Sequence, residues 1–169
     1  SLQGAAAAVA GSMVLKGAFD WLVAGNADME QYKNTLTTVL KSEKKAVETL
    51  AWANKFAAQT PFEIPQIIEA TTVMSSYGMN AQDTLGTIGD MASVMGKDLM
   101  QAVEAVADAN TGELERLKEF GITKKMIEEQ AKLMGKQVFD KKGSMKDQAA
   151  FNDVLFTMME DRFKGGMAT

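Results

Sequence analysis

Cysteine and histidine are both absent from this chain of 169 residues. Their absence excludes disulfide bonds, thiol nucleophiles and imidazole bases, and it removes nearly every usual set of zinc ligands. Proline is scarce, with two residues, whereas methionine is abundant, with thirteen. Alanine, lysine, glutamate and methionine dominate, and all four favour helices. The composition therefore predicts an all-α fold, which we expect to be a compact bundle of six to seven helices.

Charge is low overall but unevenly placed. The net charge of −4 argues against nucleic-acid binding through bulk charge. Acidic residues dominate 69–115, where Lys97 is the one basic residue, and lysines dominate 118–146. This separation would allow one copy to dock on another, or would present a basic face to DNA. We favour the simpler interpretation, in which the helices carry ordinary solvated polar faces.

Residues 1–27 form an alanine- and glycine-rich segment that we expect to be helical. It has no basic stretch before an apolar core, so it does not resemble a signal peptide. Leu2–Ala24 is nearly long enough to span a bilayer, but Lys16 and Asp20 would each cost about 2.5–3.5 kcal/mol near the membrane centre. Packing through small side chains is the favoured interpretation. Because the chain lacks a starting methionine, we expect it to be a fragment of a longer protein.

We predict that 28–169 is one helical domain, and that its first element is a single long helix over 28–58. Apolar residues follow one face of that helix, whereas Trp52 and Phe56 lie on the opposite face. A helix that is apolar on both sides is usually covered on both sides. The cover is either the bundle interior or another chain, and the sequence leaves both open.

The clearest connection between two predicted helices is the segment Thr60-Pro61-Phe62-Glu63. Thr60 and Glu63 have the spacing of a capping box, with Pro61 at the first helical position. At 137–144 we expect a turn flanked by at most a residue or two of strand. The remaining helices are predicted over 65–76, 80–95, 97–110, 123–134 and 145–163, with Asn80 and Thr123 as caps.

Gly112–Ile122 is the most distinctive segment. Gly112 can end the preceding helix, and Leu114, Leu117 and Phe120 follow at three-residue spacing. Gly121 can then adopt the left-handed conformation that ends helices. The segment predicts a short amphipathic turn that carries charge and shape but no nucleophile.

Patterns that would indicate chemistry are weak. Ser42 and Lys45 match the Ser-x-x-Lys pattern of acyl-serine enzymes, but the partner motifs are missing. Glu113 and Glu115 are two residues apart, so on a helix they would point in different directions. Neither a phosphate-binding glycine loop nor a calcium loop is present. We therefore predict no enzyme activity, no catalytic residue, no metal site and no cofactor.

Four blocks, taken in order and spacing, resemble the core domain of tail tape measure proteins of tailed bacteriophages and prophages. They are Ala58–Pro65, Gly89–Ala92, Gly112–Ile122 and Glu160–Met167. The resemblance covers about Asp28–Met167. It implies a helical virion structural protein that occupies the lumen of the tail tube, sets tail length during assembly and is expelled with the DNA.

The resemblance also implies partners and locations. The partners are tail tube proteins, tail-tip or baseplate proteins, tail assembly chaperones and further copies of the chain, without sequence-specific nucleic-acid binding. The protein would lie in the virion tail lumen, and in the host bacterial cytoplasm during assembly. Transient contact with the host membrane through 2–24 belongs to the same expectation. Unlike some relatives, the chain includes no peptidase or transglycosylase motif.

The candidate interaction residues belong to these blocks or to the long helix. They are Trp52, Thr60, Pro61, Phe62, Glu63, Gly112, Glu113, Arg116, Leu117, Phe120, Gly121, Arg162, Phe163, Gly165 and Gly166. Arg116 and Phe120 are the strongest candidates for contact with a partner. The alternative, which the sequence leaves open, is that these two residues cap and pack their own bundle.

Two other classes of function compete with the structural one. A membrane-active helical effector or pore-forming fragment is suggested by Leu2–Ala24, and an enzyme would require an unrecognised site. Within the tape measure interpretation, helix stops at Pro61, Gly78, Gly96 and Gly121 indicate a docking, nucleation or ejection domain instead of the ruler.

Overall fold

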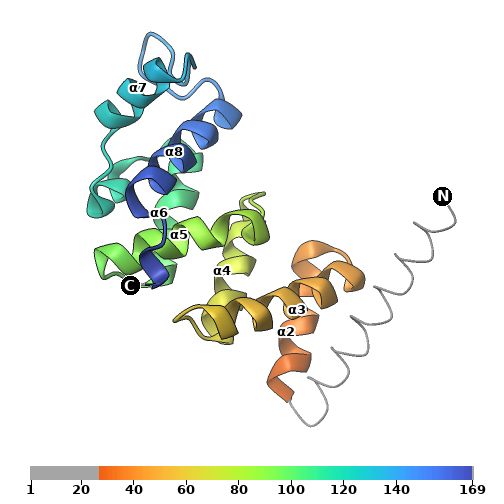
Figure 1. The fold of residues 1–169 in the computed structure, drawn as a ribbon. Helices are drawn as coiled ribbons and strands as arrows, with labels where there is room; N and C mark the ends of the chain where they lie inside the picture. The colour runs from red at the N-terminus through yellow and green to blue at the C-terminus, as the bar shows by residue number, and fades with distance from the viewer. Residues whose placement is uncertain (1–26, 169) are drawn as a thin grey trace, which may run out of the picture. The chain divides into compact units, whose positions relative to one another are not determined.

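The computed structural model describes residues 27–168, and these residues are all-α, which confirms the predicted fold class (Figure 1). Residues 1–26 of the lead-in segment, on which the membrane hypothesis for Leu2–Ala24 rests, lie outside the described residues. Within 27–168 there are seven α-helices and two 3-10 helices. They are α2 (Ala27–Leu40), α3 (Glu43–Gln59), α4 (Ile64–Ser76), α5 (Ala81–Met95), α6 (Leu99–Asn110), η1 (Glu115–Phe120), α7 (Lys124–Leu133), α8 (Gln148–Phe163) and η2 (Gly166–Ala168).

The chain divides into two compact units at Ser76 and Tyr77. We call the described part of the first, 27–76, the first unit, and 77–168 the second unit. Residues 28–169, which the sequence predicts to be one domain, are thus divided between two compact units.

In the first unit, α2, α3 and α4 each pack against the other two. Aliphatic and small side chains from all three helices form its core. These are Met29, Leu36, Ala46, Leu50, Ala53, Ile67, Ile68, Ala70 and Met74.

The predicted single helix over 28–58 is wrong, because the chain breaks between α2 and α3. Lys41 adopts a left-handed conformation, with φ of 56°. The N–H of Ser42 bonds the carbonyl of Thr37 at 3.3 Å, a bond typical of a Schellman helix end. Ser42 then caps α3, since its Oγ accepts a hydrogen bond from the N–H of Lys45 at 3.1 Å. The Ser-x-x-Lys pattern is therefore a helix cap.

The predicted capping box at the next joint is also wrong. Thr60 ends α3, and its hydroxyl donates to the carbonyl of Phe56 at 2.8 Å. Instead, the N–H of Glu63 donates to Oε1 of Gln66 at 2.9 Å, which is one of the two bonds of a capping box placed three residues later. Helix α4 starts beside Pro65, whose missing N–H costs nothing in a first turn.

In the second unit, α5 lies against α6, α8, η1 and η2, while α7 packs on α8. Its core includes three phenylalanines and many aliphatic residues, namely Leu85, Ile88, Met91, Leu99, Val103, Val106, Leu117, Phe120, Ile122, Ile127, Phe151, Val154, Leu155, Met159 and Phe163.

Local signals placed most helix ends of the second unit correctly. Oδ1 of Asn80 accepts from the N–H of Asp83, and Oγ1 of Thr123 accepts from the N–H of Met126, so both predicted caps are confirmed. The predicted turn near 137–144 is confirmed by an antiparallel bridge between Phe139 and Met145. Helix α8 starts at Gln148, three residues later than predicted, since Met145 belongs to the bridge.

Candidate functional site

The Gly112–Ile122 segment forms the 3-10 helix η1 between two left-handed glycines, Gly112 with φ of 99° and Gly121 with φ of 75°. A 3-10 helix has about three residues per turn, which explains the three-residue spacing seen in the sequence. Leu117 and Phe120 are buried as a result, whereas Leu114 and Arg116 are half-buried.

Arg116 fixes η1 to α6 through two ion pairs. Its Nη2 lies 2.8 Å from Oε2 of Glu104, and its Nη1 lies 3.3 Å from Oδ2 of Asp108. The hydrogen bond to Glu104 raises the pKa of the Arg116 guanidinium, and the bond to Asp108 raises it further. Of the two alternatives for Arg116 and Phe120, packing within their own unit is therefore the one that this structure contains.

Two blocks of the resemblance meet at Asp90. One carboxylate oxygen of Asp90 accepts from the N–H of Met167 at 2.9 Å, and the other accepts from the N–H of Gly165 at 3.3 Å. We call this pair of bonds the Asp90 latch. It connects Gly89–Ala92 with Glu160–Met167, residues about 75 positions apart in sequence.

Gly165, whose N–H belongs to the latch, and its neighbour Gly166 are both required by geometry. Gly165 has φ of 79°, a conformation that L side chains rarely adopt. A Cβ atom at Gly166 would lie 2.5 Å from Cγ2 of Val94 and 2.6 Å from the carbonyl oxygen of Asp90. Of the other candidates in this block, Phe163 is buried and Arg162 is exposed.

The candidate residues of the first unit are more accessible. Trp52 and Phe56 are half-buried, with ring centroids 5.2 Å apart and planes tilted by 32°. Phe62 and Thr60 are half-buried as well, while Pro61 and Glu63 are exposed. These aromatic rings can therefore meet a partner more readily than Phe120 can.

A cavity of about 820 Å³ lies beside η1. Gly112, Glu113 and Arg116 line one part of it, and Lys124 and Phe139 line another. Nζ of Lys124 lies 4.9 Å from the centre of the Phe139 ring and donates a hydrogen bond to the carbonyl of Gly143. Sequence reasoning missed this pair, because no local pattern connects α7 with the turn at 139–145.

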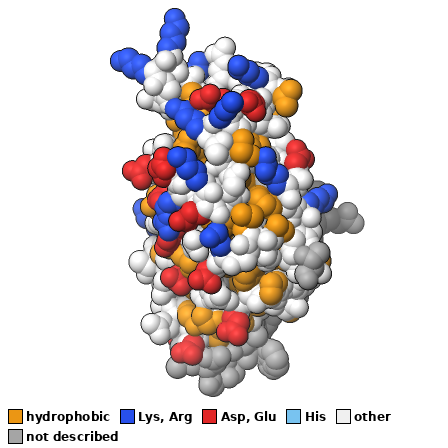
Figure 2. Space-filling model, turned by 90° about the vertical axis from the view of Figure 1, so that its left-hand side faces the viewer, with side chains coloured by type: hydrophobic (Ala, Val, Ile, Leu, Met, Phe, Trp, Pro, Cys, Tyr) orange, Lys and Arg blue, Asp and Glu red, His pale blue; other side chains and the backbone are white. Residues whose placement is uncertain are grey.

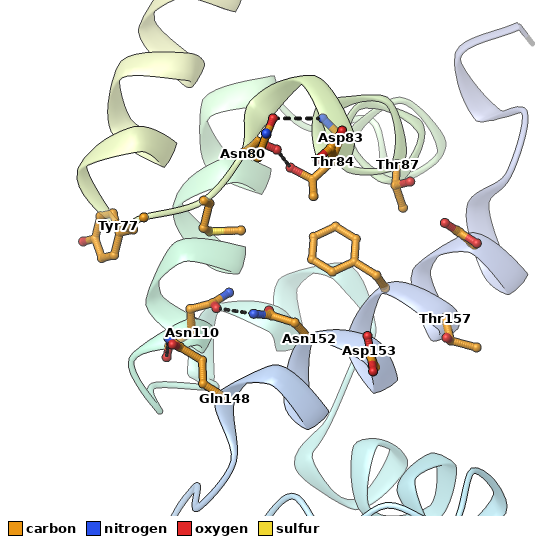
Figure 3. Close-up of a pocket in the computed structure, with 14 residues that line it drawn as sticks. Tyr77, Asn80, Asp83, Thr84, Thr87, Asn110, Gln148, Asn152, Asp153 and Thr157 are labelled. Carbon is orange, nitrogen blue, oxygen red and sulfur yellow. Dashed lines mark hydrogen bonds between the residues drawn. The ribbon is translucent and has the colours of Figure 1, made fainter. Parts of the chain in front are cut away.

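A second cavity of about 500 Å³ lies among α5, α6 and α8 in the second unit (Figure 3). Asn110, Gln148 and Asn152 form a hydrogen-bonded group on one side of it, and the Asn80 cap of α5 lies on the other. We call it the amide pocket. No local sequence pattern predicts this pocket either, since Asn110 and Asn152 are 42 residues apart.

Side-chain contacts within the second unit engage four of the eight lysines of 118–146, namely Lys118, Lys124, Lys136 and Lys146. Lys136 lies 3.1 Å from Asp153, and Lys118 lies 3.1 Å from Glu115. Lys146 donates to Oε1 of Gln137 at 2.8 Å. Figure 2 shows basic and acidic side chains next to one another on the face that it displays. These contacts agree with the favoured interpretation of ordinary polar helix faces.

Within residues 27–168, no cluster of three or more aspartate, glutamate, histidine or cysteine side chains is arranged to hold a metal ion. The helices of this part of the chain are each too short or too polar to cross a membrane. Comparison of the chain with protein-family models, with curated proteins and with solved structures finds no match in any of the three.

Proposed function

We propose that the chain is a non-enzymatic structural segment of a phage tail tape measure protein, and that it acts in docking, nucleation or ejection. The observation that carries this proposal is the Asp90 latch. It joins two of the sequence blocks on which the family resemblance rests. A third block, η1, is tied to α6 by Arg116. Residues of these three blocks thus hold helices of the second unit together. Such a stabilising role is expected of the core of a structural protein.

The short helices support docking or ejection over length measurement. The longest described helix, α3, has 17 residues and therefore spans about 25 Å. A ruler gains about 1.5 Å per residue only where a helix continues without reversal. Here the chain turns back at Lys41, Gly96 and Gly121.

Electron microscopy of tails tests the proposal. The codons for 28–167 are deleted in the parent phage or prophage, and a Gly86→Ala variant of the same gene serves as the control. We expect absent tails, or full-length tails that do not infect. Tails shortened by about 200 Å would make the segment part of the ruler instead. Normal infectious tails would overturn the tape measure assignment.

Under this proposal, we expect a tail protein to contact those candidate interaction residues that are exposed or half-buried. Trp52 and Phe62 are half-buried and Glu63 and Arg162 are exposed, whereas Phe120 is 1% exposed. A photo-crosslinking residue placed at Trp52 should therefore capture a tail protein during assembly. The same residue at Phe120 should not. Capture from Phe120 alone would contradict this assignment of the contact surface.

A further inference from the structure

The break between α2 and α3 lies in a segment whose sequence favours a continuous helix. The break consists of Lys41 and Ser42, which we call the hinge, and neither glycine nor proline occurs in 27–59. Lys41 has φ of 56°, and it is the one non-glycine residue with a positive φ among residues 27–168. A left-handed conformation is unfavourable for a residue with a Cβ atom. The hinge is therefore strained at a place where the sequence would allow a helix.

The apolar residues keep their helical spacing across the hinge. Leu36 and Leu40 are four residues apart on one side of it, and Val47 and Leu50 are three residues apart on the other. Leu40 and Val47 are separated by seven residues, which is two helical turns. A continuous helix over 27–59 would therefore carry these four side chains on one face. In the bent form, Leu40 and Val47 are only half-buried.

The local contacts that hold the hinge bent are modest. Ser42 caps α3 through its Oγ, and its N–H bonds the carbonyl of Thr37. An ion pair of 2.9 Å joins Lys33 to Glu43, but the Glu43 side chain is 69% exposed, so solvent weakens the pair. In a continuous helix, the N–H groups of 42–45 would bond the carbonyls of 38–41 instead. Because the strain at Lys41 opposes these contacts, the packing of α2 decides which form is adopted.

Straightening the hinge within one copy would remove that packing. Helix α2 contacts both α3 and α4, and its Met29 and Leu36 are buried there. A straight hinge would carry α2 away from α3 and expose these side chains, which is unfavourable. A second copy of the chain offers the same α3 and α4 surface to the displaced α2. If two copies exchange α2, the contacts of this helix outside the hinge are kept.

We propose that two copies of this chain exchange α2. In the exchanged dimer each hinge is straight, α2 and α3 form one helix over 27–59, and α2 of each copy packs on α3 and α4 of the other. The partner is a second copy, because its α3 and α4 reproduce the contacts that α2 makes in the first unit. The proposal uses the first unit alone, so it does not depend on the tape measure function.

Refolding of the full chain tests the proposal. The chain is refolded from urea at a series of concentrations, and the dimer fraction is measured by size-exclusion chromatography with light scattering. We expect a dimer whose fraction rises with concentration. Ser42→Ala should tighten the dimer at least about tenfold, because only the bent hinge needs this helix cap, and each dimer contains two hinges. Lys41→Gly should weaken it at least about tenfold, because glycine relieves the strain of the bent hinge and disfavours a continuous helix.

A proline at position 43 distinguishes exchange of α2 from other kinds of dimer. Glu43→Pro fits the bent hinge, because proline is tolerated at the first position of a helix. Ser42 also has the extended backbone that is preferred before proline, with φ of −163° and ψ of 120°. Inside a continuous helix the proline ring would clash with the preceding turn, so the dimer should weaken more than about a hundredfold. Glu43→Gln is the control, since it removes the ion pair with Lys33 but allows a straight hinge. It should dimerise at least as well as the unaltered chain.

Spin labels report the shape of the hinge directly. Since the chain has no cysteine, Glu30→Cys with Lys55→Cys adds two labelling sites at exposed positions. Labelled chain is refolded with an excess of unlabelled chain, so that each measured distance lies within one copy. In a continuous helix the two positions lie about 38 Å apart. In the monomer, α2 packs on α3, so the distance should be well below this value.

The proposal fails if the unaltered chain and Ser42→Ala both remain monomeric at the highest soluble concentration. A dimer of Glu43→Pro as tight as that of Glu43→Gln would place the dimer contact elsewhere and would also overturn it. The same holds if Lys41→Gly dimerises as well as the unaltered chain, or if dimer formation leaves the label distance unchanged. Should Ser42→Ala unfold the first unit, Lys41→Gly and Glu43→Pro still decide, because both favour the bent hinge.

Discussion

The side-chain hydrogen bonds of the two units connect residues at different distances along the sequence. Side-chain hydrogen bonds of the first unit include those from Thr37 to Lys33 and from Asn54 to Leu50, each within one helical turn. In the second unit, Gln148 bonds Asn110 across 38 positions, and Met167 bonds Asp90 across 77. The second unit is therefore fixed by polar contacts between helices that lie far apart in sequence.

The aromatic residues of the two units differ in how deeply they are buried. Phe120, Phe151 and Phe163 are buried in the second unit, whereas Trp52 and Phe56 of the first unit are only half-buried. The core of the first unit is aliphatic and small, and an ion pair between Lys33 and Glu43 at 2.9 Å links α2 to α3. We expect the first unit to be the less stable of the two, with aromatic side chains available for contact outside it.

The largest effect should come from removing a buried ring. Phe151→Ala should destabilise the second unit by about 3–5 kcal/mol, since it empties a fully buried position and removes an edge contact with Phe139. Phe56→Ala, at a half-buried position of the first unit, should cost about 1 kcal/mol. Amide hydrogen exchange during urea titration reads each unit separately. Equal losses of unfolding free energy in the two variants would show that the different burial of Phe151 and Phe56 does not determine their contributions to stability.

The Asp90 latch gives the next effect. Gly166→Ala should cost about 2 kcal/mol, because the new Cβ would lie 2.6 Å from the backbone oxygen of Asp90. Gly86→Ala in α5 is the control, since its Cβ would meet nothing within 4 Å. That change should instead stabilise the helix by about 1 kcal/mol. Thermal unfolding of both variants checks the opposite signs.

A smaller effect is expected at the break in the first unit. Lys41→Gly should stabilise this unit by about 0.5–1 kcal/mol, because glycine adopts the left-handed conformation without strain. Lys55→Gly, at an exposed position in the interior of α3, should destabilise it by about 1 kcal/mol. The fluorescence of Trp52 in a Trp21→Phe background reports the first unit alone, since the chain has two tryptophans. If Lys41→Gly destabilised the first unit, the left-handed conformation of Lys41 would not be strained.

The smallest effect concerns the ion pairs of η1. Arg116→Met should destabilise the second unit by about 0.5 kcal/mol, since the side chain is 39% exposed and solvent screens its pairs. The loss should shrink in 1 M salt, where the screening length is about 3 Å. Lys118→Met removes the more exposed pair with Glu115 and should change nothing measurable. A loss that persists in high salt would show that Arg116 acts by packing.

Sequence predicted the parts of this fold that depend on neighbouring residues. The caps at Asn80 and Thr123 and the end of η1 at Gly121 each need only three or four residues, and all were placed correctly. The break at Lys41 was missed because neither glycine nor proline marks it. Its one local signal was Ser42, a residue that favours helix caps.

The rest depends on residues that meet only after folding. Nothing near Asp90 indicates that its carboxylate will bond the backbone at Gly165 and Met167. Nothing near Asn110 indicates that Asn152 will face it. A single sequence contains helical periodicity and caps, but it contains no direct record of such pairs. For this reason the fold class was predictable and the two cavities were not.

The Asp90 latch also determines how the second unit would respond to a pulling force. Any chain that leads on from the end of the described segment departs next to Gly165 and Met167, whose N–H groups are bound to α5. Tension applied there acts on these two bonds before it can unwind α8. The central helix α5 would thus bear the load first, through the Asp90 carboxylate and through the packing of η2 against α5.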